Sequence, residues 1–161
     1  MKTVTYEEFL DFEPCWLDEA GGAERIKGYF DRFGGSMTAL DILKLEDVSA
    51  DDRLWSVLRE EFIDASILHE FACVCAEYAL SLIENPDPRS VNAIAVKRAW
   101  IRGEATDTEL AAARDAARDA TWAATGAAAG AAAWNAAWNA AWDATGAAQI
   151  AYLIMVLEDG E

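Results

Sequence analysis

A four-residue repeat in the C-terminal third of the chain constrains the fold more than any other feature. From Arg114 onward, one position in every four carries Arg, Trp or Gly, and Ala fills most of the positions between them. A step of four residues on an α-helix advances about 400°, so repeated side chains drift only about 40° per step and share one face. The repeat therefore predicts helix. Its positions are Arg114, Arg118, Trp122, Gly126, Gly130, Trp134, Trp138, Trp142 and Gly146.

This alanine-rich region is too long to form one straight helix inside a small domain. A helix from Thr106 to Leu157 would measure about 78 Å, whereas a globular chain of this size is about 40 Å across. Gly126 and Gly130 are the expected sites of a turn or a tight crossing, because a missing Cβ permits both. Gly146 is a second such site. We therefore predict a long Ala/Trp-rich helical region that is broken near these glycines.

The three closely spaced tryptophans of the repeat have two interpretations. Trp134, Trp138 and Trp142 sweep only about 80° around a helix and form one stripe. Small alanine faces allow close helix packing, and the tryptophans can then fill space against a neighbouring helix. Alternatively, the stripe is partly exposed and forms a surface for a partner or for self-association.

The rest of the chain reads as a series of capped helices. Pairs of Thr and Glu three residues apart predict capping boxes at Thr5 and Thr106, and Ser49 predicts an N-cap for a helix that runs to about Glu61. Further helices are expected from Ala23 to Phe33, from Ser66 to Ile83 as an apolar core helix, and from Pro88 to Gly103. The segment after Ser36 is left open between a helix and an extended strand.

These helices predict an all-α fold, a compact multi-helix bundle. The length of 161 residues suits a single domain. Within it, residues 1–48 are expected to form an acidic helical segment that packs on a helical core of residues 49–161.

The charge of the chain excludes one class of function. The sequence has 29 Asp and Glu against 13 Lys and Arg, a formal charge of −16. Direct binding to nucleic acid needs a basic surface, and no segment supplies one. The apolar fraction of 53% is far too high for an acidic disordered tail. The excess is concentrated early: up to Asp64 there are 16 acids and 7 bases, against 7 and 4 from Ala65 to Glu109 and 6 and 2 afterwards.

The acidic residues of the first half form the candidate binding site. No Lys or Arg occurs between Lys2 and Arg25. Such a run can be a solvated, solubilising helix face, or it can form a negative surface that binds a basic protein or imitates the phosphate track of DNA. The candidate partner-binding residues are Glu7, Glu8, Asp11, Glu13, Asp18, Glu19, Glu46 and Asp47.

The sequence offers no constellation for catalysis, metal or cofactor binding. On a helix, Cys73 lies one turn from His69 while Cys75 points about 200° away from Cys73, so the three side chains cannot converge locally. No nucleophile elbow, phosphate loop or zinc motif is present. We therefore expect no enzyme activity, no metal and no cofactor.

The chain is expected to stay in the cytoplasm. Met1-Lys2 leads directly into polar sequence, which argues against a secretory start, and three cysteines are an odd number. Residues 120–142 lack charge, but Ala gains little in lipid and the Asn and Gly residues there oppose membrane insertion.

Several motifs resemble those of known small proteins. They are Asp51-Asp52-Arg53-Leu54-Trp55, Leu68-His69-Glu70-Phe71-Ala72-Cys73, Glu84-Asn85-Pro86-Asp87-Pro88-Arg89-Ser90, Arg102-Gly103-Glu104-Ala105-Thr106 and the Ala/Trp repeat. Together they resemble small all-α proteins encoded by phages, prophages and bacterial genomes. The Asn-Pro-Asp-Pro-Arg-Ser turn with the alanine-rich helix is also similar to predicted immunity proteins of bacterial polymorphic-toxin systems. The resemblance covers about Ser49 to Leu157 and implies a non-enzymatic inhibitor.

Two functions from different classes follow. The first is an acidic inhibitory binding protein that blocks a basic, nucleic-acid-binding partner, such as a toxin, a nuclease or a host defence complex. An immunity protein or a phage anti-defence or anti-CRISPR factor would act in this way. The second is a structural or self-assembling helical protein whose Trp stripe forms a homo-oligomer.

Overall fold

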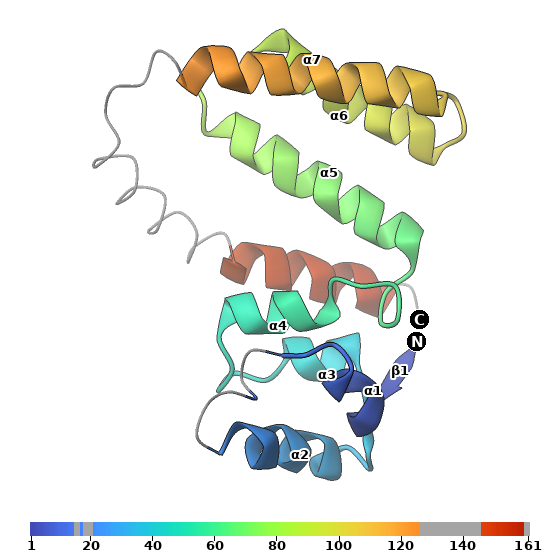
Figure 1. Cartoon of the computed structure of the whole chain (residues 1–161), viewed down its shortest axis with the longest axis vertical. Helices are drawn as coiled ribbons and strands as arrows, with labels where there is room; N and C mark the ends of the chain where they lie inside the picture. The colour runs from blue at the N-terminus through green and yellow to red at the C-terminus, as the bar shows by residue number, and fades with distance from the viewer. Residues whose placement is uncertain (15–16, 18–20, 126–145, 160–161) are drawn as a thin grey trace. The chain divides into compact units, whose positions relative to one another are not determined.

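The computed structural model describes residues 1–14, 17, 21–125 and 146–159, with the backbone alone for residues 121–125 (Figure 1). The chain forms two compact units. Unit 1 consists of Met1–Ala65 and Asp143–Glu161, and unit 2 consists of Ser66–Trp142. Helices account for most of the structure, which confirms the predicted all-α class.

Unit 1 begins with a short strand and a short helix. Strand β1 (Thr3–Thr5) pairs antiparallel with β2 (Ser36–Thr38), and Val4 lies opposite Met37. Both of these side chains are buried. Helix α1 (Tyr6–Leu10) starts with the predicted capping box of Thr5 and Glu8. The strand pair itself was not predicted, because three-residue strands leave too short a pattern to recognise.

The second helix of unit 1 lies between glycines in the left-handed backbone region. Helix α2 (Gly22–Arg32) follows Gly21, whose φ is 77°, and ends at its C-cap Phe33. Gly34 and Gly35 then have φ values of 75° and 94°, which side chains with a Cβ rarely adopt. Ile26, Tyr29 and Phe30 are buried, as the helical spacing predicts.

The segment after Ser36, left open by its sequence, contains both kinds of structure. Strand β2 passes directly into α3 (Ala39–Leu43), which Thr38 and Asp41 start with a further capping box. Helix α4 (Ala50–Val57) has the predicted N-cap Ser49. It ends at Val57, four residues before the predicted end at Glu61, and the chain turns so that Phe62 and Ile63 become buried.

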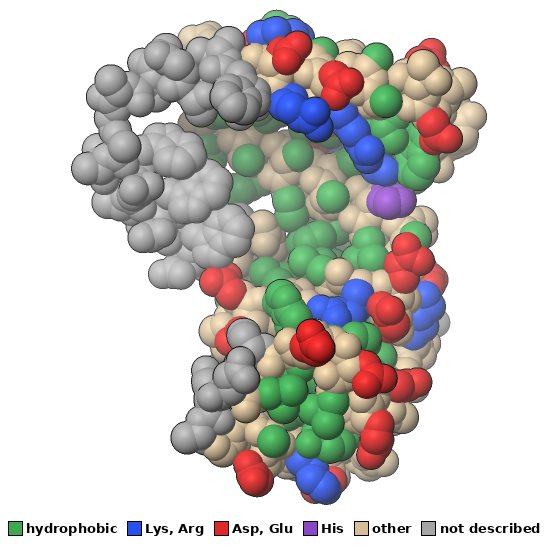
Figure 2. Space-filling model, in the orientation of Figure 1, with side chains coloured by type: hydrophobic (Ala, Val, Ile, Leu, Met, Phe, Trp, Pro, Cys, Tyr) green, Lys and Arg blue, Asp and Glu red, His purple; other side chains and the backbone are tan. Residues whose placement is uncertain are grey.

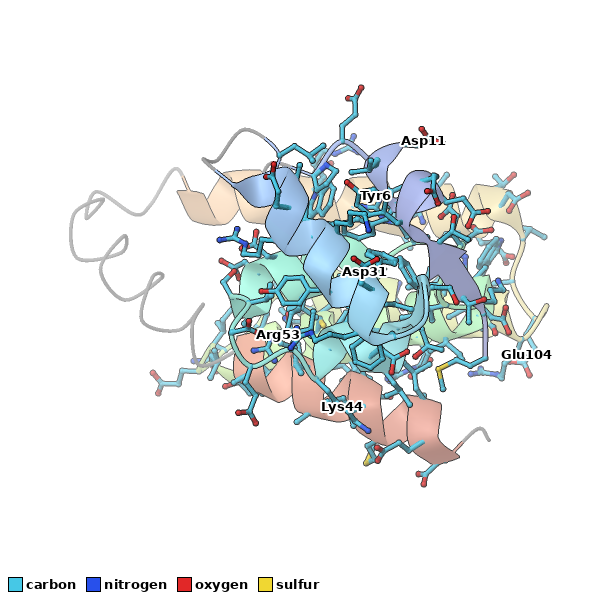
Figure 3. The ribbon with its side chains drawn as sticks, turned by 90° about the horizontal axis from the view of Figure 1, so that it is seen from below. Tyr6, Asp11, Asp31, Lys44, Arg53 and Glu104 are labelled. Carbon is cyan, nitrogen blue, oxygen red and sulfur yellow. The ribbon has the colours of Figure 1, made fainter. Side chains whose placement is uncertain are left out.

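A C-terminal helix of residues 146–159 completes unit 1. Leu153 is fully buried, and Ile150 and Leu157 are nearly so. A Cβ added at Gly146 would lie 3.1 Å from the Cβ of Ala50, so the helix approaches α4 very closely there. Lys44 Nζ and Glu158 Oε1 form an ion pair of 2.7 Å, and Lys44 lies beside this helix in Figure 3.

Unit 2 contains three described helices, α5 (Ala65–Ser81), α6 (Pro88–Ile101) and α7 (Asp107–Thr125). Pro88 stands at the start of α6, as predicted, and Asp87 is its N-cap. Gly103, with φ 74°, lies in the turn before Thr106, which starts α7 with the predicted capping box. The indole Nε1 of Trp100 donates to Asp107 Oδ1 at 2.7 Å and joins α6 to the start of α7.

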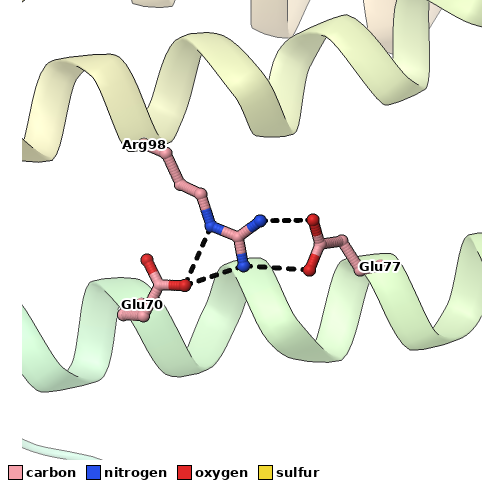
Figure 4. A network of polar contacts seen from close by, with 3 residues as sticks. All are labelled: Glu70, Glu77 and Arg98. Carbon is pink, nitrogen blue, oxygen red and sulfur yellow. Dashed lines mark hydrogen bonds and ion pairs between the residues drawn. The ribbon is translucent and has the colours of Figure 1, made fainter.

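Helix α5 differs from the predicted core helix. Only Phe71 and Cys73 of its residues are buried, and Tyr78 is 44% exposed. Its contact with α6 relies on a polar bridge instead, because Arg98 binds both Glu70 and Glu77 (Figure 4). A helix with apolar residues on all sides is buried only where other elements surround it, and the described helices of unit 2 do not surround α5.

Helix α4 and the C-terminal helix share the core of the acidic first segment, and the two units divide after Ala65. The predicted packing of residues 1–48 on a core of residues 49–161 stays a prediction. Gly126 and Gly130, the predicted break points, lie outside the described residues.

Candidate functional site

The first group of candidate carboxylates lies on α1 and the turn that follows it. Glu7, Glu8, Asp11 and Glu13 are all exposed. Asp11 is the C-cap of α1, and Figure 3 shows it at the end of this helix, away from Asp31 on α2. Glu13 has a φ of 53°, which is uncommon for a residue with a side chain. These carboxylates therefore lie at the surface of unit 1, on the short helix and in the turn that follows it.

Glu8 differs from its neighbours because its carboxylate is part of the capping box. Its Oε2 accepts hydrogen bonds from the backbone N–H of Thr5 at 2.8 Å and from the Thr5 hydroxyl at 3.0 Å. These bonds, the backbone bond first, lower the pKa of Glu8. Glu8 therefore has a structural role, and Glu7 and Asp11 are better positions at which to test binding.

The second group of candidate carboxylates lies in the turn between α3 and α4. Glu46 and Asp47 are exposed, and Asp47 Oδ2 accepts a hydrogen bond of 2.9 Å from the Tyr29 hydroxyl. Burial, followed by this bond to Asp47, raises the pKa of Tyr29. The bond fixes the turn against α2.

Helix α2 borders both groups and contributes cations to them. Lys27 forms an ion pair of 2.8 Å with Asp31; this hydrogen bond is the largest cause of its raised pKa, to which the charge of Glu7 also contributes. Arg25 and Arg32 lie near enough to Tyr29 to act on its pKa. The sequence segment without Lys or Arg therefore does not form a surface without cations in the folded protein, because α2 contributes them.

The net charge is nevertheless concentrated in unit 1. The residues of unit 1 include 20 Asp and Glu against 7 Lys and Arg, a formal charge of −13. The residues of unit 2 include 9 against 6, a formal charge of −3. Figure 2 shows acidic side chains spread across the part that carries α1 to α4, with a few basic side chains between them. Such a surface can attract and bind a basic group.

A cation with two aromatic neighbours lies at the end of α4 and was not among the predicted site residues. The Arg59 Cζ lies 4.2 Å from the ring centroid of Phe12 and 4.5 Å from that of Trp55. We call these three residues the Arg59 stack. Trp55 belongs to the apolar residues of its helix, but Leu54 and Val57 are buried whereas Trp55 is 40% exposed. Its position about 100° from Leu54 on the helix was the available signal.

Some of the predicted residues lie outside the described part of the chain. They are Asp18 and Glu19 of the acidic run and Trp134, Trp138 and Trp142 of the repeat.

The single histidine and the two described cysteines lie in unit 2. The His69 ring meets Trp100 edge-on, with 5.3 Å between centroids. Cys73 is buried and Cys75 half-buried, and burial is the largest cause of the raised pKa of each thiol. Among the described residues, no group of three or more His, Cys, Asp or Glu side chains is arranged to hold a metal ion.

None of the helices in the described ranges is long and apolar enough to cross a membrane. Comparison of the chain with protein-family models, curated protein sequences and solved structures finds no match.

Proposed function

We propose that this protein is a non-enzymatic inhibitory binding protein whose acidic unit 1 blocks a basic, nucleic-acid-binding partner. The supporting observation is the charge of −13 on unit 1 against −3 on unit 2, with six described candidate carboxylates exposed. A surface of one sign steers an oppositely charged protein to it and suppresses other partners. The resemblance to predicted immunity proteins supports the same class, and a phage anti-defence factor would act by the same physics.

The partner class follows from the chemistry of the surface. Carboxylates on short helices present negative charge at intervals, as a nucleic-acid backbone does, so a protein that binds phosphates would recognise them. A toxin nuclease or a nucleic-acid-binding subunit of a host defence complex has such a surface. Occupation of that surface would exclude the nucleic acid, and inhibition would require no catalytic group.

The test is capture of host proteins by charge variants of equal net charge. Glu7→Gln combined with Asp11→Asn removes two charges from unit 1 and leaves the capping box of Glu8 intact. Glu84→Gln combined with Asp119→Asn removes two exposed charges from unit 2 as the matched control. We expect immobilised wild-type protein to retain a basic nucleic-acid-binding protein from lysate, and the unit 1 variant to retain several-fold less than the control.

A second candidate function, self-association, is favoured by a specific observation in unit 2. Four large apolar side chains there are 44–62% exposed: Tyr78, Leu82, Ile83 and Val91. Exposed apolar surface of this kind often marks an interface. Recovery of the protein alone, as oligomers that high salt does not dissociate, would contradict the inhibitor and support a self-assembling helical protein.

A further inference from the structure

The Arg59 stack packs against the aromatic core of unit 1. Phe12 meets Phe9 edge-on with 5.8 Å between centroids, and Phe62 edge-on with 6.2 Å. Phe9 and Phe62 are 2% and 1% exposed. On its other side, Arg59 Nη2 donates to the backbone oxygen of Trp55 at 2.9 Å. The guanidinium therefore connects the buried aromatic core to the indole at the surface.

This arrangement leaves one buried hydrogen-bond donor without an acceptor in the described part of the chain. The Nε of Arg59 is buried and has no hydrogen-bond partner among the described residues. Burial also lowers the pKa of Arg59, against the opposing charge of Glu61. A buried donor without an acceptor destabilises a fold. The Arg59 guanidinium nevertheless lies against the Trp55 ring.

Trp55 remains available to a partner although Arg59 lies over it. The residue is 40% exposed, as is Leu58 at the C-cap of the same helix. An exposed tryptophan brings a large apolar ring with a polar N–H to an interface, which is why such residues are frequent energetic centres of interfaces. The exposed carboxylates Glu60 and Glu61 follow directly in the chain.

We propose that Trp55 is the anchor of the partner-binding surface and that its exposed ring surface takes an arginine or lysine side chain of the basic partner. This inference rests on the proposed function, because it assigns one contact within the same acidic unit. The faces of an indole ring attract cations, and the neighbouring carboxylates add to this attraction. A partner segment that carries basic residues is the occupant that both features favour.

A second tryptophan of the protein also has a cation of the chain over its ring. In unit 2, Lys97 Nζ lies 3.7 Å from the ring centroid of Trp100, and the indole N–H of Trp100 donates to Asp107. Trp100 and Trp55 thus each have one cation of the chain on the ring, but Trp100 is half-buried whereas Trp55 is 40% exposed. It is the matched control for Trp55, since substitution of either residue leaves the net charge unchanged.

The experiment measures binding of an octa-arginine peptide by calorimetry at physiological ionic strength. We expect Trp55→Ala to raise the Kd about fivefold to tenfold, which corresponds to the loss of one cation–π contact. Trp100→Ala should change the Kd less than about twofold. Trp55→Phe retains an aromatic face and should lie between the wild type and Trp55→Ala, which guards against a folding defect in the alanine variant.

The outcomes separate this inference from the proposed function. If the wild-type protein binds octa-arginine and Trp55→Ala binds as tightly as Trp100→Ala, the anchor is overturned and the acidic surface stands. If the wild type does not bind the peptide, both the anchor and the basic partner are overturned. A Kd raised by Trp55→Ala, together with a shift of the Trp55 indole N–H resonance on titration with peptide, supports the anchor.

Discussion

At the scale of residues, three helix starts in this protein are encoded by pairs of side chains. Thr5, Thr38 and Thr106 each accept a hydrogen bond from the backbone three residues later, where an acidic side chain bonds back to the threonine N–H. Two of these three boxes were predicted from the spacing of Thr and Glu. The third uses Asp41, which the sequence pattern did not single out because Asp is less typical at that position than Glu.

Asp87 gives a prediction about pH at this scale. Its side chain bonds the Arg89 guanidinium at 2.8 Å and 3.0 Å and the Arg89 N–H at 2.9 Å, and the bonds to the guanidinium are the largest cause that lowers the pKa of Asp87 to about 2. A carboxyl group whose pKa is lower in the folded than in the unfolded state stabilises the fold at pH values above its ordinary pKa. This contribution is lost as the pH falls from about 4 to about 2.

We therefore expect Arg89→Gln to raise the pKa of Asp87 part of the way toward its ordinary value, because the backbone bond remains. Carbon-detected NMR titration of the carboxyl group measures this directly. Arg118→Gln is the control, since Arg118 pairs with Asp115 instead. An unchanged Asp87 pKa in Arg89→Gln would show that the backbone bond alone sets the value.

At the scale of elements, two helical glycines differ in how closely another element approaches them. A Cβ added at Gly28 of α2 would meet nothing within 4 Å, whereas one at Gly146 would meet the Cβ of Ala50 at 3.1 Å. The four-residue repeat predicts a turn or a tight crossing at Gly146, and the structure shows the close approach. Which neighbour it approaches could not be predicted, because Ala50 lies almost a hundred residues earlier in the chain.

The two glycines give opposite expectations for the same substitution. Gly28→Ala should raise the free energy of unfolding by about 0.5–1 kcal/mol, because alanine restricts the unfolded chain and favours helix. Gly146→Ala should not raise the free energy of unfolding. Gly146→Val should lower it by about 1–3 kcal/mol, because the larger side chain overpacks against Ala50. Urea denaturation of the variants measures these values. Equal stabilisation by both alanine substitutions would contradict the close contact.

At the scale of the whole molecule, burial differs between elements of the two units. Four of the five residues of α3 are buried, whereas none of the 14 residues of α6 is buried. Local opening requires less free energy where few apolar contacts must be broken. The protein should therefore not unfold as one cooperative body.

Hydrogen exchange tests this expectation. Peptides from α5 and α6 should exchange at least about tenfold faster, after correction for intrinsic rates, than peptides from α3 and α4. Mass spectrometry after deuterium labelling resolves these segments. The control is the same comparison in denaturant, where the difference should vanish. Uniform protection in the native protein would show that α5 and α6 are covered, and would favour self-association through unit 2.

The sequence by itself determined the helical class, most helix starts and the acidic character of the first half. These depend on contacts between residues a few positions apart, such as Thr5 with Glu8, and on composition. Only the tertiary structure decided the return of the C-terminal helix to unit 1, the small burial of α5, the mixing of α2 cations with the acidic groups and the Arg59 stack. Those features join residues that are distant in sequence, such as Phe12 and Arg59, and no local pattern encodes which distant side chain will supply the contact.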